Sequence, residues 1–464
     1  MTERSSTIFE IEVIFVEGTT YTTKAAILQR ATEVIGVPMK DIDKTGRIQT
    51  GKGAIGTVIE ESWFGYTPNS EAEPDFPEAG VELKVTPYIR KSGNTRAKER
   101  LVCNIIDYMT EYDKTLRTSS FWHKCETMLL MSYEHRYDVP KSEYTIDKAV
   151  LFTFPEEDLA IIEHDWETIM NKVRSGNAHL ISEGDTMYLA ACTKGANAKS
   201  VRQQPFSDIP AKQRAYSLKS SYMTHILNAY IFGNQQNEHI IKDPRILQKH
   251  SFEQHIIDAV SPYIGLTQNQ LQHRFGLDCK AKNLNEVLLA KMLGVSGKIA
   301  YTDEFQKASI VPKTIRVRRD GTIKESMSFP TFDFIELSQE KWEDSTLRNY
   351  LAPTKFLFVI FQENAAGELV FDRIQFWNIP DADLDEVHRV WEKTVQIIRE
   401  GVKLFDSPRG VRNNLPKSSE SRVAHVRPHG KNAADKLPLP DGRMMTKQCF
   451  WLNNTYIANQ IKNC

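Results

Sequence analysis

The chain has 464 residues, of which 41% are hydrophobic and 26% charged, and its formal net charge is −1. These values are ordinary for a globular protein, and they exclude both a disordered chain and one embedded in a membrane. The length exceeds what one compact core usually holds, so we expect two domains.

The termini and the cysteines indicate the compartment. No run approaches the roughly 18 apolar residues of a membrane span. The start, MTERSSTIFEIEVIFVEG, carries acids where a signal peptide would be basic. We therefore expect an intracellular protein. The six cysteines lie far apart without a CxxC pair, which favours reduced, buried thiols over disulfides or a zinc site: Cys103, Cys125, Cys192, Cys279, Cys449 and Cys464.

The first half predicts an alternation of helices and strands. Residues 21–48 have apolar side chains at helical spacing, and GVP (36–38) stops that pattern. GAIGTVIEESWFGY (53–66) predicts a second helix that ends near Gly65. Strands are predicted in GVELKVTP (80–87) and KAVLFTF (148–154). The segment 158–176 predicts an amphipathic helix that stops at Gly176. The polar, irregular segment 233–251 predicts a linker, which would separate a domain at 1–232 from one at 252–464.

Four short stretches of the first half recur in the same order in the second half, which indicates a duplicated fold. EAGVELKVTP is echoed by KASIVPKTIR, DWETIMNKVRSG by VWEKTVQIIREG, KGANA by HGKNA, and RAYSLKSSY by QCFWLNNTY. A shift of 229 residues places Asp75 on Glu304, Glu82 on Val311 and Lys84 on Lys313, and we expect Pro312 to interrupt the second strand. The duplicate lacks the acidic pair, so a function explains the acids of the first half better than a structural need.

The acids surround one short apolar strand. Strand side chains alternate, so Glu82 and Lys84 share a face, about 7 Å apart, while Val81, Leu83 and Val85 face a core. Asp75 precedes a turn made by FPEAG and can bend back beside Glu82. Two convergent carboxylates suit Mg²⁺, and a lysine beside them can orient or deprotonate water, which is what phosphodiester hydrolysis requires.

Two stretches are basic although the whole chain is almost neutral. Residues 191–220 carry a net charge of +5 and residues 408–447 one of +6. Such stretches are typical of phosphate-binding faces, although solvated surface loops would have the same composition.

At this point the chain resembles a known family, the MutH-like endonucleases, and most closely the Sau-type GATC type II restriction enzymes, which carry two MutH-like domains. The matching stretches are GAIGTVIEESWFG, PDFPEAGVELKVTP, KERLVCNIIDY, the block from SEGDTMYLAACTKGANA to SSYMT, KESMSF and VRPHGKNA. The resemblance implies an α/β fold of two tandem MutH-like restriction-endonuclease domains, each a mixed central β-sheet flanked by helices. Domain 1–232 would be catalytic, and domain 252–464 an inactive DNA-binding effector domain.

The resemblance also implies roles for individual residues. Asp75 and Glu82 would bind Mg²⁺, and Lys84 would assist the attacking water. A further acid on the upstream helix is Glu60 if the alignment starts from Gly56, and Glu61 if it starts from WFG; Glu60 is slightly favoured, and a solvated helix face is the alternative for both. The residues expected to contact DNA in the first domain are Thr193, Lys194, Gly195, Asn197, Lys199, Tyr216, Ser217 and Lys219. Ser217 occupies the position at which MutH senses adenine methylation.

In the second domain the expected DNA contacts are Arg427, Pro428, His429, Gly430, Asn432, Trp451 and Asn453. The resulting interpretation is a Mg²⁺-dependent endonuclease of the bacterial cytoplasm that cuts duplex DNA at GATC, is monomeric without DNA, and binds a second site as an effector. The alternatives are a MutH-type nuclease that nicks one strand in mismatch repair, and a non-catalytic protein that clamps DNA.

Overall fold

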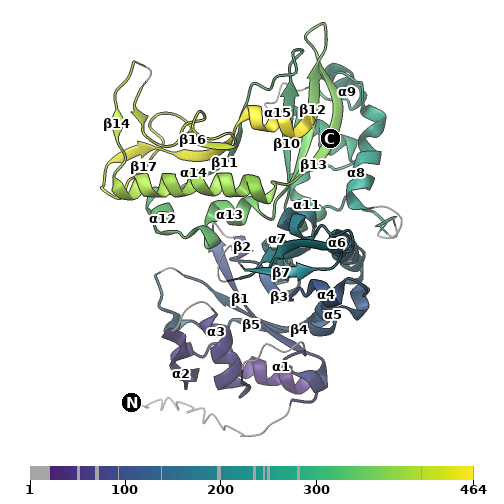
Figure 1. The fold of residues 1–464 in the computed structure, drawn as a ribbon, viewed down its shortest axis with the longest axis vertical. Helices are drawn as coiled ribbons and strands as arrows, with labels where there is room; N and C mark the ends of the chain where they lie inside the picture. The colour runs from purple at the N-terminus through teal and green to yellow at the C-terminus, as the bar shows by residue number, and fades with distance from the viewer. Residues whose placement is uncertain are drawn as a thin grey trace, which may run out of the picture. The chain divides into compact units, whose positions relative to one another are not determined.

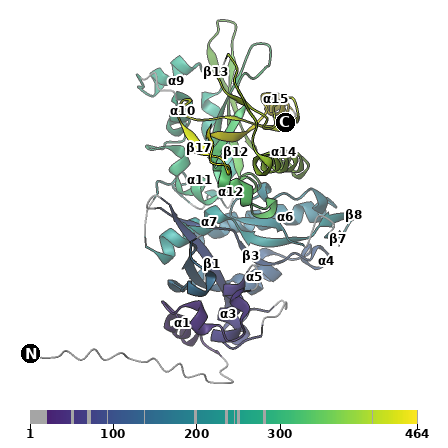
Figure 2. The ribbon, with the colours of Figure 1, turned by 90° about the vertical axis from the view of Figure 1, so that its left-hand side faces the viewer.

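The computed structural model describes residues 21–49, 53–67, 73–91, 94–136, 138–195, 200–233, 237–243, 246–247, 251–278, 283–408 and 410–462. The chain divides into two compact units, which are Met1–Ile89 with His123–Thr153, and Arg90–Trp122 with Phe154–Cys464. Figures 1 and 2 show the mixed helices and strands of both. In the described part of the chain, no helix combines the length and apolar character needed to cross a membrane.

In its described residues, the first unit is built on three strands and a group of short helices. Its elements are α1 (Lys24–Glu33), α2 (Met39–Ile42), α3 (Ala54–Val58) with a π-helical turn (Ile59–Trp63), β1 (Glu82–Lys91), β4 (Thr127–Glu134) and β5 (Lys148–Thr153). Strand β1 pairs in parallel with β4, with Glu82 opposite Met128, and β4 pairs antiparallel with β5. The inner side chains of β1 and β4 join those of α1 and α3 in one apolar core.

The predicted helix over residues 21–48 is two helices in the structure. Helix α1 begins after Thr23, whose side chain accepts the Ala26 N–H, and ends at Glu33. Helix α2 follows Pro38, which occupies the N-cap position and has an extended backbone. The GVP sequence therefore ends the first helix as predicted, and the apolar pattern beyond it belongs to a second one.

The second unit contains the rest of the chain. Its first part holds β2 (Asn94–Ala97), β3 (Leu101–Ile105), α4 (Tyr108–Glu111), α6 (Glu156–Arg174), β6 (Leu189–Thr193), β7 (Val201–Gln204), β8 (Ser207–Lys212), β9 (Arg214–Leu218) and α7 (Ser220–Ile226). Helix α5 (Ser120–Cys125) lies where the two units meet in the sequence. Strand β9 is the middle strand of the antiparallel order β3-β9-β6, and β7 pairs with β8 as a hairpin. Gly176 follows α6 with φ +72°, so the predicted stop is confirmed.

The later elements of this unit begin with a helical segment. They are α8 (Phe252–Val260), α9 (Gln268–Arg274), α10 (Leu284–Met292), α11 (Asp303–Lys307), β10 (Ile310–Val317), β11 (Met327–Phe332), α12 (Phe334–Gln339), α13 (Thr346–Leu351), β12 (Lys355–Glu363), β13 (Leu369–Trp377), α14 (Asp381–Glu400), β14 (Leu404–Phe405), β15 (Arg412–Asn413), β16 (Ala424–Pro428), β17 (Lys436–Pro438), β18 (Met444–Thr446), β19 (Gln448–Leu452) and α15 (Asn454–Lys462).

The strand pairing of the first half recurs in the second half. Strand β10 pairs in parallel with β12, β12 pairs antiparallel with β13, and the long helix α14 follows, just as α6 follows β1, β4 and β5. The antiparallel order β11-β19-β16 likewise repeats β3-β9-β6, and the hairpin β17-β18 repeats β7-β8. Two distant parts of the sequence therefore adopt the same order of parallel and antiparallel pairs.

The expectation that Pro312 interrupts the second strand is wrong, because β10 runs through this residue. Strand β10 lies at the end of the order β10-β12-β13, and an outer strand tolerates a missing N–H. In the predicted linker 233–251, Ile240 and Ile241 are buried and donate their backbone N–H groups to Glu304. Both flanks of this linker lie in the second unit, and the boundary at 232 and 252 stays a prediction.

Candidate active site

A tight turn places Asp75 at the start of β1. Pro77–Ala79 form a single 3₁₀ turn, and Gly80 ends it with φ +62°, a value that side-chain-bearing residues rarely adopt. Phe76 and Val81 close the turn by exchanging backbone hydrogen bonds of 2.9 and 3.2 Å. The sequence FPEAG therefore reverses the chain, as predicted.

Asp75 and Glu82 converge across this turn. The Leu83 N–H donates to Asp75 Oδ2 at 2.9 Å, and the Asp75 N–H donates to Glu82 Oε2 at 3.2 Å. The side chains of Val81 and Leu83 are buried in the core, so the side chain of Glu82 lies on the opposite face of the strand. Glu82 is itself only 2% exposed, so this carboxylate lies in a largely desolvated position.

Two lysines approach Glu82 Oε1. Lys84 Nζ donates to this oxygen at 2.7 Å, which agrees with the shared strand face. Lys124 Nζ, from α5, lies 3.6 Å from the same oxygen and donates to the Glu73 carbonyl at 3.2 Å. Lys124 is buried, and sequence reasoning did not identify it. The only signal was a lysine within the apolar stretch FWHKC, since buried lysines need a partner.

The structure separates the two candidate helical acids. Burial, together with the nearby Asp75 and Glu82 carboxylates, raises the pKa of Glu60 to about 7, although Lys84 opposes the shift. Glu61 instead forms an ion pair of 3.0 Å with Arg47. Both belong to the π-helical turn Ile59–Trp63, a rare geometry that often occurs at functional sites. Glu60 is therefore the acid that faces the carboxylate pair.

The charges of this cluster fit a divalent cation. Burial raises the pKa of Glu82, and Asp75 adds to that effect while Lys84 opposes it. A cation bound to the carboxylate oxygens would relieve this repulsion, and hard oxygen donors are what Mg²⁺ prefers. Among the described residues, no set of three or more His, Cys, Asp or Glu side chains is already arranged as a metal site. Asp75 and Glu82 thus supply suitable carboxylate oxygen ligands for a metal ion, but not a complete set of ligands.

The loop predicted to read bases is exposed where the structure describes it. Thr193 ends β6, and Thr193, Lys194 and Gly195 are all exposed. The Lys194 N–H donates to the Gln213 carbonyl at 2.9 Å, which ties the start of the loop to the chain before β9. Asn197 and Lys199 lie outside the described residues.

Three other predicted DNA contacts are buried instead. Tyr216, Ser217 and Lys219 are at most 2% exposed, because β9 is a middle strand and the residue after it is enclosed as well. Lys219 Nζ donates to the Pro353 carbonyl at 2.8 Å, and Tyr216 donates to Glu111 at 3.3 Å. The structure gives these side chains no surface for DNA, and part of the +5 charge of residues 191–220 is internal. A basic composition did not reveal this, because the acceptors lie far away in the sequence.

The predicted effector residues divide into an exposed group and a buried one. Arg427 lies over the Trp451 ring, 4.2 Å from its centre, and the His429 ring meets Trp451 edge-on at 5.2 Å. Pro428 and Asn432 are exposed and Gly430 is half-buried. Asn453 is buried, where it contacts His425 Nδ1 at 2.6 Å and donates to the Ser421 carbonyl at 2.7 Å. Asn453 therefore lies in the core beside the half-buried Trp451, over which the exposed Arg427 lies.

Comparison with known proteins places this geometry in context. The family model described as DNA mismatch repair enzyme MutH matches residues 64–165, a range that includes Asp75, Glu82, Lys84 and Lys124. The type II restriction enzyme Sau3AI of Staphylococcus aureus is 39% identical over 96% of this chain and 99% of its own length. DNA mismatch repair protein MutH of Shewanella woodyi is 30% identical over 38% of this chain and 78% of its own length. DNA mismatch repair protein MutH of Shewanella baltica strain OS185 is 28% identical over 45% of this chain and 95% of its own length.

Proposed function

Since this chain belongs to the family of type II restriction enzymes that includes Sau3AI, we propose that it hydrolyses phosphodiester bonds of duplex DNA at the sequence GATC with Mg²⁺. The observation that carries the proposal is the convergence of Asp75, Glu82 and Lys84 at the start of β1. This cluster lies inside the segment that the MutH family model matches.

The chain's own residues have distinct tasks in this reaction. Asp75 and Glu82 would hold Mg²⁺, with Glu60 close enough to influence their charge. A bound Mg²⁺ supplies Lewis acidity toward the phosphate and favours deprotonation of water. Lys84 Nζ, held as an ammonium group 2.7 Å from Glu82, would orient the attacking water. Lys124 contributes a second positive charge beside Glu82.

Sequence reading is assigned to the exposed segment Thr193–Gly195. A side chain from a surface loop can reach base edges in a groove, and a lysine there can donate to guanine acceptors. Lys194 is the candidate for this contact. The burial of Tyr216, Ser217 and Lys219 argues that they support the loop from within the unit rather than touch DNA.

We assign the second half the role of an effector domain that binds a second GATC site. The repeated strand pairing supports two tandem MutH-like domains. At the matching positions of the second half, Glu304 accepts the Ile240 and Ile241 N–H groups, and Lys313 Nζ donates to the Ser328 carbonyl at 3.2 Å. The duplicate therefore uses these positions for internal contacts. Its exposed Arg427, which lies over the half-buried Trp451 ring, suits a nucleic-acid surface.

The cellular setting follows from the same assignment. The partner is double-stranded DNA, and a bacterial cytoplasmic location is proposed because restriction acts on DNA inside the cell. A monomer is proposed for the protein without DNA, since one chain already carries two DNA-binding halves.

Incubation with a plasmid and Mg²⁺ separates the alternatives. A restriction enzyme gives discrete fragments whose ends map to GATC, and these should vanish when EDTA removes the metal. A MutH-type enzyme gives nicked circles only, and a non-catalytic clamp leaves the plasmid intact. Either of the last two results with correctly folded protein would overturn the proposal.

A further inference from the structure

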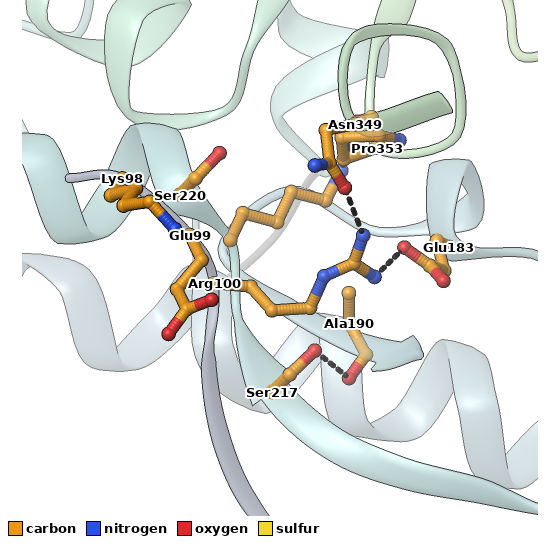
Figure 3. Close-up of a pocket in the computed structure, with 10 residues that line it drawn as sticks. Lys98, Glu99, Arg100, Glu183, Ala190, Ser217, Ser220, Asn349 and Pro353 are labelled. Carbon is orange, nitrogen blue, oxygen red and sulfur yellow. Dashed lines mark hydrogen bonds and ion pairs between the residues drawn. The ribbon is translucent and has the colours of Figure 1, made fainter. Parts of the chain in front are cut away.

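A buried carboxylate lies directly behind the candidate reading loop. Glu183 is 3% exposed and forms ion pairs with two guanidinium groups, those of Arg100 and Arg348. Burial alone would raise the pKa of Glu183, but the two arginines lower it below its usual value. Glu183 is therefore a fixed negative charge and a constant acceptor. Figure 3 shows its contact with Arg100, which also reaches Asn349.

Glu183 and Arg348 together hold the backbone N–H and the hydroxyl group of Thr193. The Thr193 N–H donates to Glu183 Oε1 at 3.3 Å, and Arg348 Nη2 donates to Thr193 Oγ1 at 2.9 Å. The same Nη2 lies 3.4 Å from Glu183 Oε1. Thr193 is the last residue of β6 and the first of the exposed segment Thr193–Gly195, so these bonds fix the point from which that segment leaves the sheet.

Arg348 comes from the second half of the chain, on a helix with little freedom to move. Ser345 caps α13 through the Arg348 N–H, and Leu347 and Leu351 lie in the apolar core of the second half. Arg348 Nη1 also donates to the Glu343 carbonyl at 3.3 Å. The guanidinium is thus anchored on its own side before it reaches Thr193.

Neighbouring contacts hold the segment before β6 in the same way. Lys355 Nζ donates to the Asp185 carbonyl at 2.9 Å. Gly184 has no Cβ, and a Cβ there would come within 2.3 Å of the Asn378 side chain. The second half therefore contacts residues 183–185 closely, and the contact requires glycine.

We propose that Arg348 is a positioning residue for base discrimination, through which the second half sets the geometry of the Thr193–Gly195 reading segment. The inference rests on the proposed function, because it assigns that segment to base reading. Hydrogen bonds to base edges tolerate little displacement, so a loop that loses its anchor discriminates poorly even when the active site is intact.

The test uses the full-length protein with Arg348→Ala, Arg348→Lys and a control, Arg389→Ala. Arg389 is an exposed arginine of the same half, on α14, and it pairs only with Glu386 among its described ion partners. Two readouts are needed. The first is hydrogen exchange of the Thr193 and Lys194 amides without DNA. The second is the ratio of kcat/KM on a short duplex with one GATC to that on duplexes with one base changed.

In Arg348→Ala we expect the Thr193 amide to exchange faster and the discrimination ratio to fall by about tenfold. Arg348→Lys keeps the charge, so its Thr193 amide exchange and its discrimination ratio should both lie between those of Arg348→Ala and the wild type. Arg389→Ala should match the wild type in both. Unfolding midpoints within a few degrees of the wild type identify the folded variants; if Arg348→Ala does not fold, Arg348→Lys carries the test.

Unchanged exchange in a folded variant would overturn the positioning role. Faster exchange with an unchanged ratio would overturn the link to base discrimination. A wild-type protein that makes no cut at GATC would instead refute the proposed function, while faster exchange in Arg348→Ala would still support the positioning role.

Discussion

At the scale of single residues, we expect substitutions of Glu82 and Lys84 to affect cleavage but not DNA binding. Glu82→Ala removes a proposed metal ligand, and Lys84→Ala removes the group that positions water, while few phosphate contacts change. We expect each variant to lose cleavage by at least about a hundredfold and to keep its affinity for a GATC duplex. Plasmid cleavage and gel-shift titration measure the two properties.

A matched control for these variants is Lys148→Ala, because Lys148 is an exposed lysine on β5 of the same unit. It should cleave like the wild type. Cleavage by Glu82→Ala or Lys84→Ala at a rate near that of the control would contradict the roles assigned to them.

Lys219 gives the free energy of unfolding a characteristic pH dependence. Burial, together with the nearby charge of Lys355, lowers the pKa of Lys219 to about 7, although Asp165, Glu183 and Asp185 oppose the shift. Between pH 7 and the unfolded-state pKa near 10.5, the unfolded chain binds a proton at Lys219 that the folded chain does not, so stability rises with pH. In this range, the free energy of unfolding of the wild type should rise, relative to that of Lys219→Met, by up to about 1.4 kcal/mol per pH unit.

Urea denaturation of both proteins at pH 7, 8 and 9 would measure this difference. Parallel pH profiles for the two proteins would show that Lys219 is already charged in the folded state.

The residues of the candidate site differ in how far the sequence alone could predict them. The convergence of Asp75 and Glu82 was predictable because it depends on a short turn and on strand alternation, both of which are local. The proximity of Lys124 depends on the pairing of β1 with β4, and the burial of Lys219 depends on Pro353. Contacts between residues this far apart in the sequence leave no local pattern.

At the scale of elements, the β7–β8 hairpin has a strained turn. Pro205 and Phe206 connect Gln204 to Ser207, and Phe206 has φ +65° with a side chain that is 68% exposed. A type II turn with proline at its first central position favours glycine at the second, since a Cβ is disfavoured there. Phe206→Gly should therefore raise the free energy of unfolding by about 1 kcal/mol.

Phe206→Ala is the control, because it removes the ring and its contact with Tyr112 while it keeps the Cβ. In chemical denaturation, the free energy of unfolding of Phe206→Ala should be equal to or below that of the wild type, and that of Phe206→Gly should be above it. A glycine variant no more stable than the alanine variant would show that the turn is not strained.

The elements themselves were predictable where periodicity was clear. Helix α6 and strands β1 and β5 appear where apolar spacing and a stop signal coincide. The failure at Pro312 came from a rule that holds for central strands, whereas the position of β10 at the end of its sheet depends on strand order. Within residues 21–48 the stop at GVP was predicted, but the second helix beyond it was not predicted as a separate element, because two helices in succession keep a similar apolar spacing.

At the scale of the whole molecule, a second half that binds GATC should change the rate at the first site. We expect plasmids with two GATC sites to be cut about 5- to 150-fold faster than plasmids with one, which is the range of a typical coupling free energy. A short GATC duplex added in trans should accelerate the one-site plasmid. Initial rates of cleavage on the two plasmids, with and without the duplex, measure the coupling.

Arg427→Ala should weaken this stimulation, because it removes the cation that lies over Trp451. Equal rates on the two plasmids, with no effect of the added duplex, would mean that the second half only supports the first. The four ordered echoes in the sequence led to the expectation of a duplicated fold, but the repeated pairing of strands could be seen only in the structure.

The proline in β10 also bears on how the protein behaves at high concentration. A strand at the border of a sheet can recruit a strand from another molecule, which begins aggregation. Pro312 has no N–H to offer such a strand, and β10 has only β12 beside it in its described sheet. Pro312 thus makes that border of the sheet a poor template for a strand from another molecule.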